Sequence, residues 1–271
     1  GEPADLQRFA EIGKKGVLAL MCDSTNAERP GATKSERAVG DTFETLFKKA
    51  EDRRIIIATF SSNVHRLQQI VDCCVKHGRK LAVSGRSMVN MVERAAEMGY
   101  LNIPEGTLVD LDVLSRYPDN KLVIATTGSQ GESMAALSRM ANNMHRKITI
   151  GAGDTVIFSS NPIPGNEKSV TKIINELLRK GADVIFQDAH VSGHACQEEL
   201  KLIYSLVKPK YAVPVHGEYR HRKANANLAK SLGIPKENTI ACGDGFNDLT
   251  MIKYAHVGVA IANATDVVKE N

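Results

Sequence analysis

Short apolar runs alternate with longer segments of helical period along most of this chain, and that alternation limits the fold more than any other feature. The predicted strands span residues 17–21, 54–60, 80–83, 121–125, 155–158 and 183–187. The predicted helices between them include residues 35–50, 134–142 and 167–180. Strands that alternate with helices predict an α/β fold with a mostly parallel sheet flanked by helices on both faces.

Size and composition exclude several protein classes. A length of 271 residues allows one large domain or two modest ones, and 42% hydrophobic with 24% charged residues excludes disordered, collagen-like and coiled-coil chains. The net charge of +4 permits a polyanionic partner without requiring one. Five cysteines without a CxxC pair argue against a zinc knuckle or a disulfide framework and favour a reducing, cytoplasmic setting. No apolar run is long enough to predict a membrane helix, and a start at Gly1 suggests a piece of a longer protein.

Four predicted strand-to-helix junctions carry small hydroxyl, amide and glycine residues, at 61–63, 127–131, 159–161 and 192–194. Ligands of open α/β sheets bind beyond the carboxyl ends of the strands, where helix N-termini present free N–H groups, so this pattern favours a phosphate-rich ligand. The alternative is that these residues only cap helices. Neither a Walker loop nor a GxGxxG fingerprint occurs, which argues against an NTPase or a nicotinamide enzyme.

Candidate phosphate-binding residues come from these junctions and from basic residues beside predicted strand ends. These candidates are Ser61, Asn63, Arg66, Arg86, Thr127, Gly128, Ser129, Ser159 and Asn161. Histidines near strand ends, His194 and His216 among them, could bind a metal, although a hydrogen-bonded or capping histidine is the alternative for each. The zinc motifs HExxH and HxHxDH do not occur.

Five segments, taken in order, resemble ribonuclease J, a family in the β-CASP branch of the metallo-β-lactamase fold. They are CDSTNAERPG at 22–31, TGSQGE at 127–132, SSNPIPGNE at 159–167, VSGHA at 191–195 and PVHGEYR at 214–220. The resemblance runs from Gly1 to about Asn238. It implies a β-CASP domain inserted into a metallo-β-lactamase domain, two zinc ions, and RNA as the substrate of phosphodiester hydrolysis that is sensitive to a 5′-monophosphate.

The resemblance also implies roles for individual residues. Asp23 would orient His194, which would donate a proton to the leaving 3′ oxygen, and His216 would be a zinc ligand. Ser192, Gly193 and Ala195 would line a pocket for a nucleotide phosphate. A carboxylate–imidazole pair can act as a general acid near neutral pH, and zinc can generate the attacking hydroxide.

One departure from the family pattern is large. The family's HxHxDH motif, its next histidine and its bridging aspartate are absent, which leaves His216 as the single expected zinc ligand. One imidazole cannot hold a zinc pair, so we expect this chain to lack efficient zinc-dependent nuclease activity. A non-catalytic module that binds RNA or nucleotide phosphates is therefore the alternative function. RNA is the expected partner, with no membrane association, and self-association is compatible with the sequence.

The last segment resembles a different family. ACGDGFNDL at 241–249 is similar to the fourth motif of haloacid dehalogenase-type phosphatases, in which Asp244 and Asp248 would hold Mg²⁺. A Mg²⁺-dependent phosphatase of this type is thus a second alternative function. That family's DxD nucleophile motif is not recognisable, however, so the glycines could simply form a tight turn. The predicted organisation is a partial metallo-β-lactamase segment at 1–35, a β-CASP domain at 36–187, a returning metallo-β-lactamase segment at 188–238 and a dehalogenase-like tail at 239–271, which suggests a natural or engineered chimera.

Overall fold

The computed structural model divides the chain into two compact units. It describes residues 4–163, 165–186, 191–235, 240–243, 252–253, 257–260 and 264–270. One unit consists of Ser35–Val191, and the other combines Glu2–Lys34 with Ser192–Asn271. The second unit is therefore built from two segments that are far apart in the sequence.

The Ser35–Val191 unit is built on a five-stranded sheet in which every pairing is parallel. Its strands are β2 (Arg54–Ala58), β3 (Lys80–Ser84), β4 (Leu122–Thr126), β5 (Asp154–Phe158) and β6 (Asp183–Ile185). They lie in the order β3-β4-β2-β5-β6. The predicted α/β class with a parallel sheet is confirmed.

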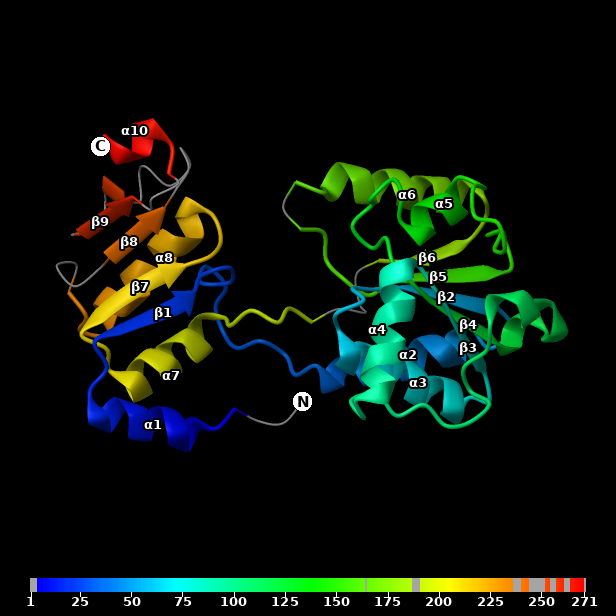
Figure 1. Cartoon of the computed structure of the whole chain (residues 1–271), viewed down its shortest axis with the longest axis horizontal. Helices are drawn as coiled ribbons and strands as arrows, with labels where there is room; N and C mark the ends of the chain where they lie inside the picture. The colour runs from blue at the N-terminus through cyan, green and yellow to red at the C-terminus, as the bar shows by residue number, and fades with distance from the viewer. Residues whose placement is uncertain are drawn as a thin grey trace. The chain divides into compact units, whose positions relative to one another are not determined.

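Helices cover both faces of this sheet (Figure 1). The helices on one face are α2 (Arg37–Lys49), α3 (Val64–Lys76) and α4 (Arg86–Glu97), and those on the other are α5 (Ala136–Ala141) and α6 (Glu167–Arg179). Ile55 and Ile57 of β2 belong to the core on the first face, whereas Ile56 belongs to the core on the second. Burial on both faces explains why the strand reads as a continuous apolar run. Two short 3₁₀ helices, Leu111–Arg116 and Asp119–Lys121, precede β4.

The parallel register brings the polar junctions to one edge of the sheet. Ala58 pairs with both Thr126 and Phe158, and Ser84 pairs with Thr126, so β2, β3, β4 and β5 end at the same level. The junctions that follow these strands therefore line a common carboxyl edge, as expected of a parallel sheet.

The second unit contains a two-stranded parallel sheet of β1 (Ala19–Asp23) and β7 (Tyr211–Val215). Its helices are α1 (Leu6–Lys15), α7 (Gln197–Val207) and α8 (Tyr219–Ser231). A second parallel pair, β8 (Ile240–Gly243) and β9 (Val257–Ala260), and the short helix α10 (Asp266–Lys269) follow. Tyr204, Ala212, Ala229 and Ile234 form a buried cluster against which Leu20 and Cys22 of β1 pack.

Several element boundaries differ from the sequence prediction. Strand β1 spans Ala19–Asp23 rather than residues 17–21, because the backbone of Asp23 still pairs with Val215. Helix α5 spans Ala136–Ala141 rather than 134–142, because the backbone of Ala135 is extended. Asp244 and Asp248, predicted as Mg²⁺ ligands, lie outside the described residues. Among the helices described, none is both long enough and apolar enough to cross a membrane.

Candidate catalytic centre

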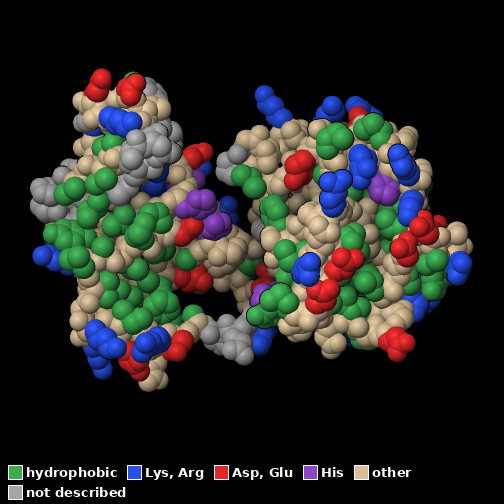
Figure 2. Space-filling model, viewed as in Figure 1, with side chains coloured by type: hydrophobic (Ala, Val, Ile, Leu, Met, Phe, Trp, Pro, Cys, Tyr) green, Lys and Arg blue, Asp and Glu red, His purple; other side chains and the backbone are tan. Residues whose placement is uncertain are grey.

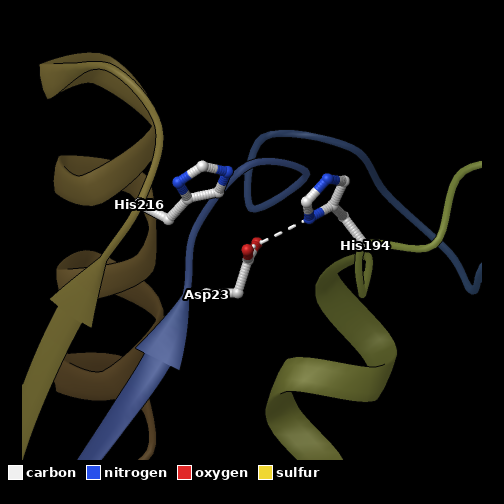
Figure 3. Close-up of side chains that lie close together, drawn as sticks. All are labelled: Asp23, His194 and His216. Carbon is white, nitrogen blue, oxygen red and sulfur yellow. Dashed lines mark hydrogen bonds and ion pairs between the residues drawn. The ribbon is translucent and has the colours of Figure 1, made fainter. Parts of the chain in front are cut away.

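Three titratable side chains from distant parts of the sequence meet in the second unit (Figure 3). Asp23 ends β1, His194 lies on the loop before α7, and His216 directly follows β7. Each offers one oxygen or nitrogen atom, and these atoms all lie within 4.8 Å of one another. Histidine side chains gather on the surface of this unit in the space-filling view (Figure 2).

Asp23 and His194 form a hydrogen-bonded pair. The Oδ2 atom of Asp23 lies 3.0 Å from Nδ1 of His194, and its Oδ1 atom accepts a hydrogen bond of 2.8 Å from the backbone N–H of Thr25. Because an ionised carboxylate can only accept, the proton of this pair belongs on Nδ1 of His194. The two side chains are 37% and 40% exposed, so a ligand can approach them.

The loop that carries His194 is held from the segment that follows β1. The amide of Asn26 donates to Oγ of Ser192 at 2.9 Å and to the carbonyl oxygen of His194 at 2.9 Å. The hydroxyl of Thr33 donates to the same carbonyl oxygen at 2.8 Å. Two residues that were not among the predicted site residues therefore fix the backbone of His194, although Asn26 lies inside the CDSTNAERPG segment at 22–31.

Glu199, in the first turn of α7, stabilises the same loop. Its Oε2 atom accepts hydrogen bonds from the backbone N–H of Thr33 at 2.9 Å and from that of Cys196 at 2.8 Å. Burial raises the pKa of the Glu199 carboxyl, but these hydrogen bonds outweigh burial and leave the pKa below its ordinary value. The ionised form of Glu199 is thus the form that holds the loop.

His216 occupies an uncommon backbone conformation. Its φ of 59° lies in the left-handed region, which few residues other than glycine adopt, and Gly217 continues with a φ of 87°. Two left-handed residues turn the chain sharply from β7 into α8, which begins at Tyr219. The ring of His216 stacks on that of His194 with centroids 5.7 Å apart.

The donor set of this cluster suits zinc. Zinc in proteins accepts imidazole nitrogens and carboxylate oxygens and usually has three or four protein ligands. In the part of the chain that the structure describes, Asp23, His194 and His216 form the only group of three or more His, Cys, Asp or Glu that could hold a metal ion. Three such residues fit one ion at most, not a zinc pair.

The predicted phosphate-binding residues of the Ser35–Val191 unit divide into accessible and buried groups. Ser61, Arg86, Thr127 and Asn161 have side chains that are partly or fully exposed near the carboxyl edge of the sheet. Asn63 caps α3 by accepting from the backbone N–H of Arg66, so the capping interpretation holds at that position.

Arg66 does not lie where a ligand could reach it. Its side chain is fully buried, its Nε atom is 2.6 Å from Oε1 of Glu36, and it also donates to the carbonyl and hydroxyl oxygens of Ser159. A buried guanidinium that already binds a carboxylate is not open to a phosphate, so the predicted ligand contact of Arg66 does not fit this arrangement. Ser159 shares this internal role, and Ser129 is only 3% exposed.

Gln130 connects two of the junctions, although it was not among the site residues predicted from the sequence. Its Nε2 atom donates to Oγ of Ser160 at 3.2 Å and to the carbonyl oxygen of Asn161 at 2.9 Å. Its Oε1 atom accepts from the backbone N–H of Ile163 at 2.7 Å. Gln130 therefore fixes the 159–163 loop against the 127–131 loop.

Two family models match consecutive parts of the chain. Residues 52–177 match the model described as ribonuclease J, beta-CASP domain. Residues 182–240 match the model described as Zn-dependent metallo-hydrolase RNA specificity domain. The first match lies within the Ser35–Val191 unit, and the second contains both His194 and His216.

Curated relatives carry the same family name. Ribonuclease J 1 of Streptococcus pyogenes serotype M3 is 51% identical over 248 residues, which cover 90% of this chain and 44% of that protein. Ribonuclease J of Helicobacter pylori strain 26695 is 47% identical over 90% of this chain, and ribonuclease J2 of Bacillus subtilis is 44% identical over 88%. The chain spans less than half the length of these relatives.

A solved structure, described as a protein of unknown function from Enterococcus faecalis V583, has a similar fold, with a TM-score of 0.53 and 16% identity over 78% of this chain and 48% of that one. The likeness of residues 239–271 to a haloacid dehalogenase is not supported by the matched family models, which are ribonuclease J and metallo-hydrolase domains. Both family models and the curated relatives agree, and the chain therefore belongs to the ribonuclease J family.

Proposed function

We propose that this chain is the RNA-binding and proton-donating part of a ribonuclease J that hydrolyses phosphodiester bonds of RNA. The observation that carries the proposal is the hydrogen bond of 3.0 Å between Asp23 and His194, next to His216. On this proposal, residues 36–187 are the β-CASP domain and residues 1–35 and 188–238 are metallo-β-lactamase segments.

His194 has the geometry of a general acid. Asp23 holds Nδ1, so Nε2 is the atom left to face a substrate. The imidazolium would release the Nε2 proton to the leaving 3′ oxygen and end as a neutral ring whose Nδ1 proton stays on the Asp23 hydrogen bond. Such proton transfer contributes about 10²–10⁴-fold to a rate.

His216 would hold zinc when the metal is bound, and zinc would lower the pKa of a bound water so that hydroxide forms near neutral pH. The left-handed backbone of His216 and Gly217 turns this imidazole toward the Asp23–His194 pair. The three donor residues fit one ion at most, and a His194 that acts as proton donor is not available to the metal. We therefore expect the chain alone to hydrolyse RNA slowly or not at all.

A second candidate function is RNA binding without hydrolysis. Lys and Arg side chains gather over α5 and α6 on the surface of the Ser35–Val191 unit (Figure 2), and Lys168, Lys172 and Arg179 lie together along α6. In the other unit, Gly193 is exposed with open space around its Cα, and Ser192 precedes it. This loop could receive a terminal phosphate beside His194.

Binding and cleavage of a labelled single-stranded RNA test both functions. We expect the chain to bind 5′-monophosphorylated RNA more tightly than the same RNA with a 5′-hydroxyl end. We expect His194→Ala to leave binding nearly unchanged, because His194 acts on the leaving group. Equal binding of the RNA and of a double-stranded DNA of the same length would contradict an RNA function. Efficient cleavage by the wild-type chain that survives in His194→Ala would contradict the proton-donor role.

A further inference from the structure

A buried amide contacts the end of β1, where the backbone carries Asp23. Asn225, in the middle of α8, is fully buried, and the two N–H groups of its Nδ2 atom are shared among three oxygens at the end of β1. These are the carbonyl oxygens of Cys22 at 3.3 Å and Asp23 at 3.1 Å, and the hydroxyl oxygen of Ser24 at 3.0 Å. The backbone that carries the Asp23 carboxylate is thus held by one side chain.

The orientation of this amide is determined by its neighbours. Carbonyl oxygens can only accept, so the NH₂ group of Asn225 must face β1 and its Oδ1 atom must face away. There Oδ1 accepts a hydrogen bond of 2.9 Å from the hydroxyl of Tyr204, a residue of α7 that is 2% exposed. Tyr204 therefore prevents the amide from turning over.

The position of Asn225 on α8 links Asp23 to His216. Helix α8 starts at Tyr219, two residues after the turn formed by His216 and Gly217. Helix α8 therefore constrains both residues. It holds His216 through the short backbone connection between them, and it holds Asp23 through the hydrogen bonds of Asn225.

We propose that Asn225, oriented by Tyr204, is a positioning residue that sets Asp23 in register with His194 and His216. Its importance for catalysis rests on the function proposed above, whereas its effect on the geometry of the pair does not. A residue with a purely structural role would change the stability of the unit without changing how Asp23 and His194 pair.

The test uses the tautomer of the His194 ring, read from its ¹⁵N chemical shifts at about pH 9, where imidazole is neutral. In the wild-type chain the Asp23 carboxylate should hold the proton on Nδ1. Asn225→Asp keeps the shape of the side chain but removes both N–H donors. We therefore expect the Nδ1–H tautomer of His194 to fall below half of the population. Hydrogen exchange of the Thr25 amide, which donates to Asp23, should become about tenfold faster.

Two further variants keep the test decisive. Tyr204→Phe removes only the hydroxyl group, so it should change both readouts in the same direction but less, and it serves where Asn225→Asp does not fold. Val207→Ala, also buried on α7, has no hydrogen-bonding side chain and should lower stability without changing the tautomer. The proposal would be overturned if folded Asn225→Asp showed neither a changed His194 tautomer nor a changed exchange rate of the Thr25 amide. If Asn225→Asp does not fold, the same result in Tyr204→Phe would overturn it.

The outcome is separate from that of the RNA experiments, because neither the tautomer nor the exchange rate requires RNA or metal. A shifted tautomer in a chain that fails to bind RNA would support the positioning role and contradict the proposed function. RNA binding by the wild-type chain, with an unshifted tautomer in Asn225→Asp, would support the proposed function and contradict the positioning role.

Discussion

The carboxylate of Asp23 and the imidazole of His194 are 171 residues apart in the sequence and are joined by a hydrogen bond of 3.0 Å. The pair exists because the chain leaves the second unit after Lys34 and returns to it at Ser192. Asn26 and Thr33 then hold the returning loop through the carbonyl oxygen of His194. The chemistry of the site therefore depends on contacts between two segments of one unit.

Zinc binding should be weak and should depend on His216. A site with few ligands should fall well short of the binding free energy of about 10–16 kcal/mol found for four-ligand structural zinc sites. We expect His216→Ala to reduce the affinity measured by calorimetry, and the exposed His65→Ala in the other unit to leave it unchanged. An equal loss in His194→Ala would mean that His194 binds the metal, and it would contradict the proton-donor role.

Gly217→Ala should destabilise the second unit and displace His216. A side chain at φ 87° is strained, and its Cβ atom would lie 3.0 Å from Nδ1 of His221. Gly31→Ala is the matched control, because Gly31 has a φ of 79° with open space around it. We expect the control to cost about 1–2 kcal/mol from the left-handed backbone alone and Gly217→Ala to cost more, as measured by urea unfolding. Equal costs would show that the contact with His221 is unimportant.

Arg66→Met should lower the stability of the Ser35–Val191 unit. The substitution leaves Glu36 without its buried partner, and breaking a buried ion pair typically costs about 3–5 kcal/mol. Because the Glu36 side chain is 24% exposed and water can reach it, we expect the lower end of this range. Arg86→Ala, an exposed change in the same unit, should alter the urea midpoint little. A stable Arg66→Met with weakened RNA binding would restore Arg66 as a ligand contact.

RNA affinity should fall steeply as salt concentration rises, because phosphate contacts release counterions. For single-stranded RNA each contact adds about 0.7 to the slope of log affinity against log salt concentration. Arg86→Ala at the carboxyl edge should therefore reduce the slope by about 0.7. Arg94, in the last turn of the same helix and paired with Glu97, is the control that should leave the slope unchanged. Binding that is independent of salt would contradict the predicted phosphate contacts.

Glu199 should make the second unit sensitive to acid. Its folded-state pKa is lowered from the ordinary value of 4.5, so its stabilising contribution is present above that pH and disappears as the pH falls through the folded-state pKa. The difference in unfolding free energy between the wild type and Glu199→Gln should therefore be largest near neutral pH and shrink on acidification. Urea unfolding at a series of pH values measures it. A difference that stays constant with pH would mean that the charge of Glu199 is not what holds the loop.

Local patterns in the sequence were sufficient to predict the α/β class and the order of the elements, whereas the residues of the candidate centre were predicted from family resemblance. The run of Ile55, Ile56 and Ile57 predicts a strand buried on both faces, because such a strand has no polar face to show. Asp23, His194 and His216 lie inside motifs that resemble ribonuclease J, and their carboxylate and imidazole groups are of the types that bind metals and transfer protons.

Tertiary structure decided what each polar residue does. Arg66 and Arg86 both follow strand ends in the sequence, yet one is fully buried against Glu36 and the other is exposed. Nothing local distinguishes them, because burial and partners depend on segments many residues away. Asn225 gave no sequence signal for the same reason: its three acceptors lie about 200 residues earlier, at separations of 201 to 203. The sequence by itself determined which groups are available, and only the packing of distant segments decided which of them meet.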